Sequence, residues 1–193
     1  MSLPAHTDWL HHRLTLEATP DDLAALRAAA RGAGIIPWRL DLDRLEEDWF
    51  LRLVAPAPAH RPAQAPRLST AGARILAGQL REAVARRHAI AVSAVGLSEA
   101  CPFDLHALVP VPDVMLRLGP DDPQALAWLW TQWGTTAPLR HVREITPEMD
   151  RRAGGRMVLS FWSADWTPWH AFSRLIEQWP AVRFDIRPDY GAR

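Results

Sequence analysis

Residues 154–187 have the sequence GGRMVLSFWSADWTPWHAFSRLIEQWPAVRFDIR, which decides the fold. The glycine pair is typical of a turn, and residues 157–162 after it are apolar at nearly every position, as in a strand buried on both faces. Residues 167–179 carry apolar side chains at helical spacing, and residues 182–187 alternate between apolar and charged ones. A strand, a helix and a half-buried strand in this order indicate an α+β domain in which residues 157–162 form a central strand.

The start of the chain predicts the other half of the same sheet. Residues 10–18 alternate between apolar and polar side chains, as a half-buried strand does. Thr19 and Pro20 then begin a helix, and residues 139–145 predict one more strand. The resulting order is strand, helix, insertion, strand, strand, helix, strand, which is the split βαβ or ferredoxin-like plan with an antiparallel sheet.

The insertion extends over about residues 35–100 of this single expected domain. A short amphipathic helix is predicted around residues 42–53, and the many prolines between Ala55 and Pro66 predict an extended linker or loop. Ser69 can cap a long helix that runs to about His88, with an apolar side formed by Leu76, Leu80, Ala83 and Val84. The stretch 89–95 has the composition of a strand.

Composition excludes several kinds of chemistry. Lysine and arginine together balance aspartate and glutamate at 22 each, so no overall charge attracts nucleic acid or an acidic membrane. The chain has no lysine, which rules out Schiff-base and phosphate-loop lysines, and a single cysteine, Cys101, which rules out an intramolecular disulfide. Residues 1–10 do not resemble a signal peptide and no apolar run reaches membrane-spanning length, so we expect a cytoplasmic protein without a membrane partner.

Several short motifs occur in an order that resembles one known family. They are Arg13–Leu26 (RLTLEATPDDLAAL), Phe103–Pro112 (FDLHALVPVP), Trp133-Gly134-Thr135, Leu159–Trp169 (LSFWSADWTPW), Trp179-Pro180 and Tyr190. Together they are similar to the YubB-type ferredoxin-like domain family. The similarity covers the start of the chain and most of the part after Cys101, whereas residues 35–100 look like an insertion that short members lack.

The resemblance implies a ferredoxin-like fold and a gene carried on a plasmid, phage or other mobile genetic element. The family is functionally uncharacterised and offers no catalytic residue to transfer. This chain also departs from the family pattern, with Thr136 and Ala137 in place of a basic residue and a tryptophan, and Thr167-Pro168-Trp169 in place of serine-proline-proline.

Tryptophans are concentrated near the C-terminus, where seven of the ten lie between Trp128 and Trp179. Such a cluster forms either a core or a binding surface. Helical spacing with Leu126 and Leu129 favours the core for Trp130 and Trp133, in a helix opened by Asp121 and Pro123, and likewise for Trp179 beside Phe172, Leu175 and Ile176. The candidate binding residues are Trp128, Thr135, Asp165, Trp166 and Trp169, with Asp165 serving either to orient a ligand or to brace its loop.

A basic stripe on the long helix offers an alternative site. Arg74, Arg81 and His88 are seven residues apart and Arg86 lies beside them, so these side chains can follow the phosphates of a nucleic acid. A solvated helix face explains the same pattern.

The sequence shows no recognisable catalytic or metal-binding constellation. The eight histidines lack metal-ligand spacing, Cys101 has no evident base beside it, and Asp104 and His106, on one face of a predicted strand, form either a proton-transfer fragment or a structural pair. We therefore favour a non-enzymatic accessory protein of a mobile element that binds another protein, or a second copy of itself, without a cofactor or metal. A nucleic-acid-binding protein and a small hydrolase or transferase are the alternatives.

Overall fold

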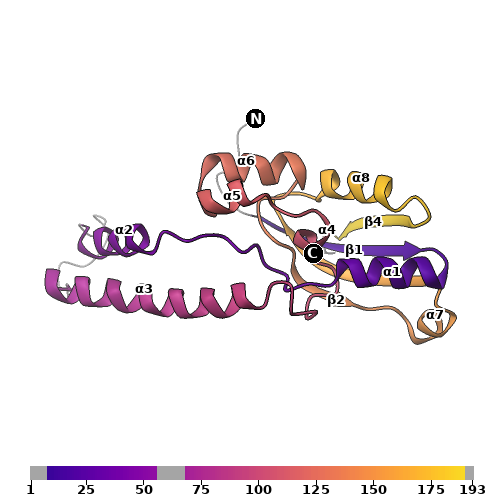
Figure 1. Cartoon of the computed structure of the whole chain (residues 1–193), viewed down its shortest axis with the longest axis horizontal. Helices are drawn as coiled ribbons and strands as arrows, with labels where there is room; N and C mark the ends of the chain where they lie inside the picture. The colour runs from indigo at the N-terminus through magenta and orange to yellow at the C-terminus, as the bar shows by residue number, and fades with distance from the viewer. Residues whose placement is uncertain (1–7, 56–67, 190–193) are drawn as a thin grey trace. The chain divides into compact units, whose positions relative to one another are not determined.

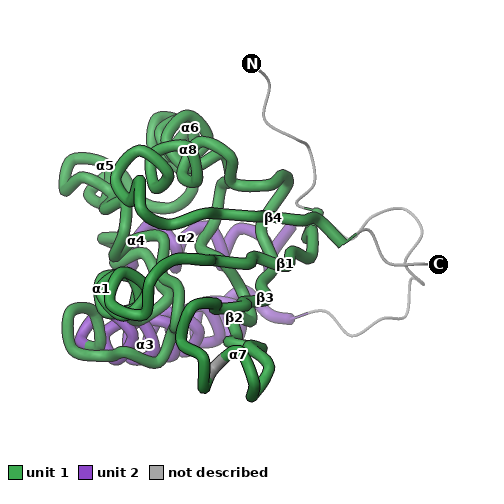
Figure 2. Tube along the Cα trace, turned by 90° about the vertical axis from the view of Figure 1, so that its right-hand side faces the viewer, with its two compact units in different colours: residues 1–39, 94–193 green, residues 40–93 purple. Residues whose placement is uncertain are grey.

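The computed structural model describes residues 8–55 and 68–189 of the chain (Figure 1). It divides the chain into two compact units, one of residues 1–39 and 94–193 and one of residues 40–93 (Figure 2). The proline-rich segment expected up to Pro66 lies outside the described residues from Pro56 on. The elements are β1 Trp9–Glu17, α1 Pro20–Ala30, α2 Leu42–Val54, α3 Thr70–Ser93, α4 Leu105–Leu108, α5 Asp113–Leu118, α6 Pro123–Gln132, β2 Arg140–Glu144, α7 Glu148–Ala153, β3 Arg156–Ala164, α8 Trp169–Gln178 and β4 Arg183–Asp189.

The first unit is built on a four-stranded sheet in the order β2-β3-β1-β4. Every neighbouring pair of strands is antiparallel, which confirms the predicted α+β class with an antiparallel sheet. The strand expected at residues 157–162 is β3, and it lies between two other strands as predicted. Its apolar side chains therefore have neighbours on both sides within the sheet.

The core lies on one face of this sheet, between the strands and the helices α1 and α8. In the pairing of β1 with β3, Leu14 lies opposite Leu159 and Leu16 opposite Met157, and all four side chains are buried. From the helices, the core receives Leu23, Leu26, Ala30, Ala171, Phe172 and Leu175. Alternation along the strands directs the intervening side chains to the other face.

The helix caps follow the sequence with small differences. The Thr19 hydroxyl accepts a hydrogen bond from the backbone N–H of Asp22, as predicted for an N-cap. The helix α6 begins at Pro123 as predicted, but its capping side chain is Asp122 and Asp121 is exposed, so only the predicted capping residue is wrong by one position. The predicted buried position of Ile176 in α8 is also wrong, because its side chain is 50% exposed.

Asp104 joins the end of α1 to the chain that returns from the insertion. Gly32 and Cys101 exchange backbone hydrogen bonds of 3.1 and 2.9 Å, and the Asp104 carboxylate accepts from the backbone N–H groups of Gly34 and His106, both at 2.8 Å. Asp104 is the N-cap of α4, so the prediction that it shares a strand face with His106 is wrong. The Asp104 carboxylate accepts hydrogen bonds from these two backbone N–H groups. In an extended strand the N–H of His106 would instead bond a neighbouring strand.

The second unit is a pair of helices, α2 and α3. Their packing buries Ala73 and Ala77, while Leu80 is 38% exposed, so the predicted apolar side of α3 is shifted toward the alanines. The strand predicted at residues 89–95 is wrong, since α3 continues to Ser93 and a turn follows. Alanine has the highest helix propensity, and its repetition there outweighs the strand preference of Ile90 and Val92.

Gly32→Ala is expected to lower the free energy of unfolding by about 2–4 kcal/mol. A Cβ at this position would lie 2.3 Å from the Asp104 Oδ2 atom and 2.9 Å from its Cβ, so the buried carboxylate would have to leave its two backbone donors. Gly78→Ala in α3 is the control, because its Cβ would meet nothing closer than Glu46 Oε1 at 4.0 Å. Urea denaturation should show a loss for the first variant and a neutral or stabilising effect for the second; equal midpoints would contradict this account.

Candidate binding loop

The connection from β3 to the first residue of α8 exposes two tryptophans. Trp166 is 59% and Trp169 46% exposed, whereas Thr167 and Pro168 between them are buried. Large indole rings that remain in water while their neighbours are buried are unusual and mark binding surfaces when they are held in place. We call residues 165–169 the tryptophan loop.

Asp165 braces the first half of the tryptophan loop. Its backbone is in the left-handed region at φ +65°, which aspartate tolerates better than most residues. One carboxylate oxygen accepts from the Thr136 hydroxyl at 2.6 Å and the other from the backbone N–H of Asp8 at 3.3 Å, while its own N–H donates to the Asp8 carbonyl at 2.6 Å. Of the two roles that the sequence left open for Asp165, orienting a ligand or bracing its loop, these bonds fit the second.

His12 and Thr167 hold the second half of the loop from the core. The His12 ring is buried, and because the Leu10 carbonyl at 2.9 Å can only accept, Nδ1 carries the ring proton. Nε2 is then free to accept from the Thr167 hydroxyl, also at 2.9 Å. Burial lowers the pKa of His12 from its ordinary value of 6.5 to about 4, so the ring is neutral at physiological pH.

The connection from α6 to β2 supports the loop from a third side. The buried Thr135 hydroxyl donates to the Ala164 carbonyl at 2.9 Å, and the Trp133 carbonyl accepts from the backbone N–H of Ala171 in α8. Gly134 has φ +80°, and a Cβ there would lie 3.2 Å from the backbone nitrogen of Trp169. The Trp133-Gly134-Thr135 triplet therefore packs closely beneath the tryptophan loop. Thr135 is buried, so it positions the loop but does not contact solvent.

Trp128 belongs to a different environment. It is half-buried and packs against the core, with its ring centroid 6.4 Å from that of the buried Trp133 in an edge-on arrangement. Trp133 and Leu129 are buried as predicted, whereas Trp130 is only half-buried. Of the five candidate residues, the structure thus exposes two, buries one as a support, uses one as a brace and packs one against the core.

The bracing residues Asp8, His12 and Thr136 were not identified from the sequence. His12 was placed only on a strand face opposite His11, which the structure confirms, since His12 is buried and His11 is not. The position of His12 on an otherwise apolar strand face is the one sequence signal from which a polar partner nearby could have been predicted.

The basic stripe on α3 lies against acidic side chains of α2. Arg74 is 2.6 Å from Glu47 and its guanidinium carbon lies 3.5 Å above the centre of the Phe50 ring. Arg81 is 3.1 Å from Asp43 and 3.5 Å from Glu46. Arg86 is 3.9 Å from Glu82, one turn away on the same helix, and His88 is half-buried. A nucleic acid on this face would have to compete with these carboxylates.

Cys101 and His106 show no sign of activation. Burial raises the pKa of the Cys101 thiol to about 11, and the thiol donates to the Phe103 carbonyl. Burial lowers the pKa of His106, whose Nδ1 accepts from the backbone N–H of Val111. Among the described residues, no three histidine, cysteine or acidic side chains are grouped so as to hold a metal. The same part of the chain contains no helix with the length and apolarity to cross a membrane.

Comparison with known proteins identifies little. No protein-family model and no curated protein matches the chain. The crystal structure of the protein api92 from Yersinia pseudotuberculosis, of family DUF1281, resembles it with a TM-score of 0.48 and 12% sequence identity over 95% of this chain and 90% of that one. Similarity of this size establishes neither a shared fold nor a shared function.

His12 is expected to make stability depend on pH. Because its folded pKa of about 4 is below the unfolded value of 6.5, the unfolded chain binds the extra proton first as the pH falls. Its neutral form should therefore contribute fully above pH 6.5, and about 2 kcal/mol should be lost between pH 7 and pH 5. Urea denaturation at both pH values should show a smaller difference in His12→Gln; an equal difference would assign the pH dependence to other groups.

Proposed function

We propose that this chain is a ferredoxin-like domain of the YubB type that carries a helical insertion. The strand order β2-β3-β1-β4, with α1 after β1 and α8 after β3, is the order that the split βαβ plan predicts, which supports the proposal. The helices α2 and α3 form a compact unit at residues 40–93, inside the expected insertion of about residues 35–100. The family resemblance further implies an accessory protein of a mobile genetic element.

We further propose that the domain acts by binding another protein through the tryptophan loop. The observation that carries this proposal is the exposure of Trp166 and Trp169 on a loop that three other segments hold in place. A rigid loop loses little conformational entropy on binding, and tryptophan is the residue type most enriched among energetically dominant contacts. The partner would offer apolar pockets for the two indoles.

Helix α8 extends this apolar surface. Trp169 and Ile176 are seven residues apart, which places them on the same side of the helix, and both are about half exposed. His170 contacts the Trp130 carbonyl and Arg174 donates to Gln132, so α6 flanks α8 with polar groups. An apolar strip with a polar border is the usual arrangement at a protein interface.

The helical unit supplies a second candidate protein surface. Its described residues expose the large apolar side chains of Leu51, Leu68, Ile75, Leu80 and Ile90 to between 38% and 71%. Among the described residues of these two helices only Ala73 and Ala77 are fully buried, and a partner or a second copy of the chain would cover the exposed apolar side chains. The hydrolase or transferase alternative finds no comparable support, since Asp104 and His106 are both engaged with backbone groups.

Replacement of both exposed indoles should abolish partner binding. In an affinity capture with the full chain as bait, Trp166→Ala/Trp169→Ala should retain at least tenfold less of the specific partner, because two central contacts are lost. Val114→Ala/Met149→Ala is the matched control, since these side chains are 60% and 79% exposed on other helices of the same unit. Circular dichroism should show that both variants remain folded.

If the folded tryptophan variant captured the same proteins as the wild type, the tryptophan loop would not be the binding surface. Size-exclusion chromatography of the purified wild type and variants separates self-association from binding to another protein, because only self-association raises the apparent mass when no other protein is present.

A further inference from the structure

The face of the sheet turned away from α1 and α8 carries polar and charged side chains. Pairing of the four strands places residues side by side across this face in rows, since paired residues direct their side chains to the same side. Glu144 of β2 pairs with Arg27 of α1 at 3.0 Å and thus faces the helices, so its neighbour Arg143 faces the other way. We call this surface the open sheet face.

One row across the open sheet face contains three arginines. Arg143 lies opposite Ser160, Ser160 opposite Arg13, and Arg13 opposite Arg187. All three arginines are exposed. Neighbouring strands lie about 4.8 Å apart, so the row extends across roughly 14 Å.

The adjacent row supplies aromatic rings. Arg140 lies opposite Trp162 and Trp162 opposite His11, with the Trp162 and His11 ring centroids 5.0 Å apart. Trp162 is 38% exposed although it belongs to a central strand. Arg140 also lies 3.9 Å above the ring of Trp9, the next residue of β1 on this face.

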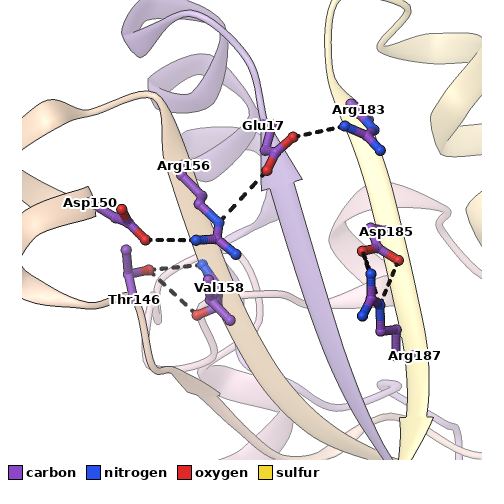
Figure 3. A network of polar contacts seen from close by, with 8 residues as sticks. All are labelled: Glu17, Thr146, Asp150, Arg156, Val158, Arg183, Asp185 and Arg187. Atoms are coloured by element: carbon purple, nitrogen blue, oxygen red, sulfur yellow. Dashed lines mark hydrogen bonds and ion pairs between the residues drawn. The ribbon is translucent and has the colours of Figure 1, made fainter.

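The far end of the open sheet face is neutralised, whereas the row of Arg143, Arg13 and Arg187 is neutralised only at Arg187. Glu17 contacts Arg156 and Arg183, Asp150 also contacts Arg156, and Asp185 contacts Arg187 (Figure 3). Within the described part of the chain, Arg13 and Arg143 form no ion pair. Although the protein has no net charge, the guanidinium groups of Arg13 and Arg143 give this part of the open sheet face a local positive charge beside the exposed indole of Trp162.

We propose that the open sheet face binds single-stranded nucleic acid, with phosphates on the row of Arg143, Arg13 and Arg187 and a base stacked on Trp162. The charge of the row complements a phosphate backbone, and the guanidinium group binds phosphate oxygens in a two-pronged geometry. Stacking on a ring requires an unstacked base, which selects a single strand over a duplex. This surface differs from both the tryptophan loop and the stripe on α3.

The test is fluorescence anisotropy of labelled oligouridylate, oligodeoxythymidylate and a duplex, each of about 12 nucleotides, titrated with the full chain. The single strands should bind more tightly than the duplex. Three phosphate contacts predict that raising the salt from about 50 to about 200 mM weakens binding tenfold to twentyfold. Comparison of the two single strands shows whether RNA or DNA is preferred.

Matched variants locate the site. Arg13→Ala/Arg143→Ala should weaken binding at least tenfold and reduce the salt slope, whereas Arg74→Ala/Arg81→Ala removes the same charge from α3 and should leave the affinity unchanged. Trp162→Leu should weaken binding about fivefold without changing the salt slope, because stacking involves no counterions. Circular dichroism checks that each variant is folded.

Three results would overturn the proposal. They are no binding of either single strand at low salt, unchanged affinity in Arg13→Ala/Arg143→Ala, and preference for the duplex. If the second result were accompanied by loss of binding in Arg74→Ala/Arg81→Ala, the nucleic acid would be assigned to α3.

Discussion

The pairing of β1 with β3 determines what each face of the sheet can do. Alternation along a strand places Leu14 and Leu16 against the helices, and the same alternation places Arg13 in solvent. A shift of one residue in this register would bury the arginine and expose the leucines, at a cost no other part of the unit could offset. The hydrophobic core thus fixes the position of every charged group on the opposite face.

The tryptophan loop depends on the same pairing through a single buried side chain. His12 lies opposite Phe161 in this register, with the two rings stacked, and its ring nitrogens bond the Leu10 carbonyl and the Thr167 hydroxyl. A neutral imidazole connects an apolar core to a polar loop because one nitrogen donates and the other accepts. The exposed indoles are therefore held by the interior of the unit, and their rigidity is part of the fold.

The sequence predicted the regular parts of this structure well and the irregular parts poorly. Periodicity located β1, β3, α1 and α8 to within a few residues, because each has one side in a continuous core. It failed for residues 89–95, where alanine-rich helix and strand have similar patterns. It also failed for Asp104, whose carboxylate caps α4 and in addition accepts from Gly34, a residue distant in sequence. For the candidate site, local spacing placed Trp166 and Trp169 in a loop but could not show that Asp8 and Thr136 brace it, since those contacts are long-range.

The bridge between Gly32 and Cys101 has a consequence for how this chain could have acquired or could lose its helical unit. The bridge joins two positions inside the first unit, shortly before its backbone leaves at Arg39 and shortly after it re-enters at Ala94, so the ends of the segment between Gly32 and Cys101 are already adjacent. The entropy of closing a loop rises only slowly with its length, about 0.6 kcal/mol for each doubling. Segments of very different size can therefore be exchanged at this position with little effect on the sheet, and a short connection is expected to replace the whole insertion.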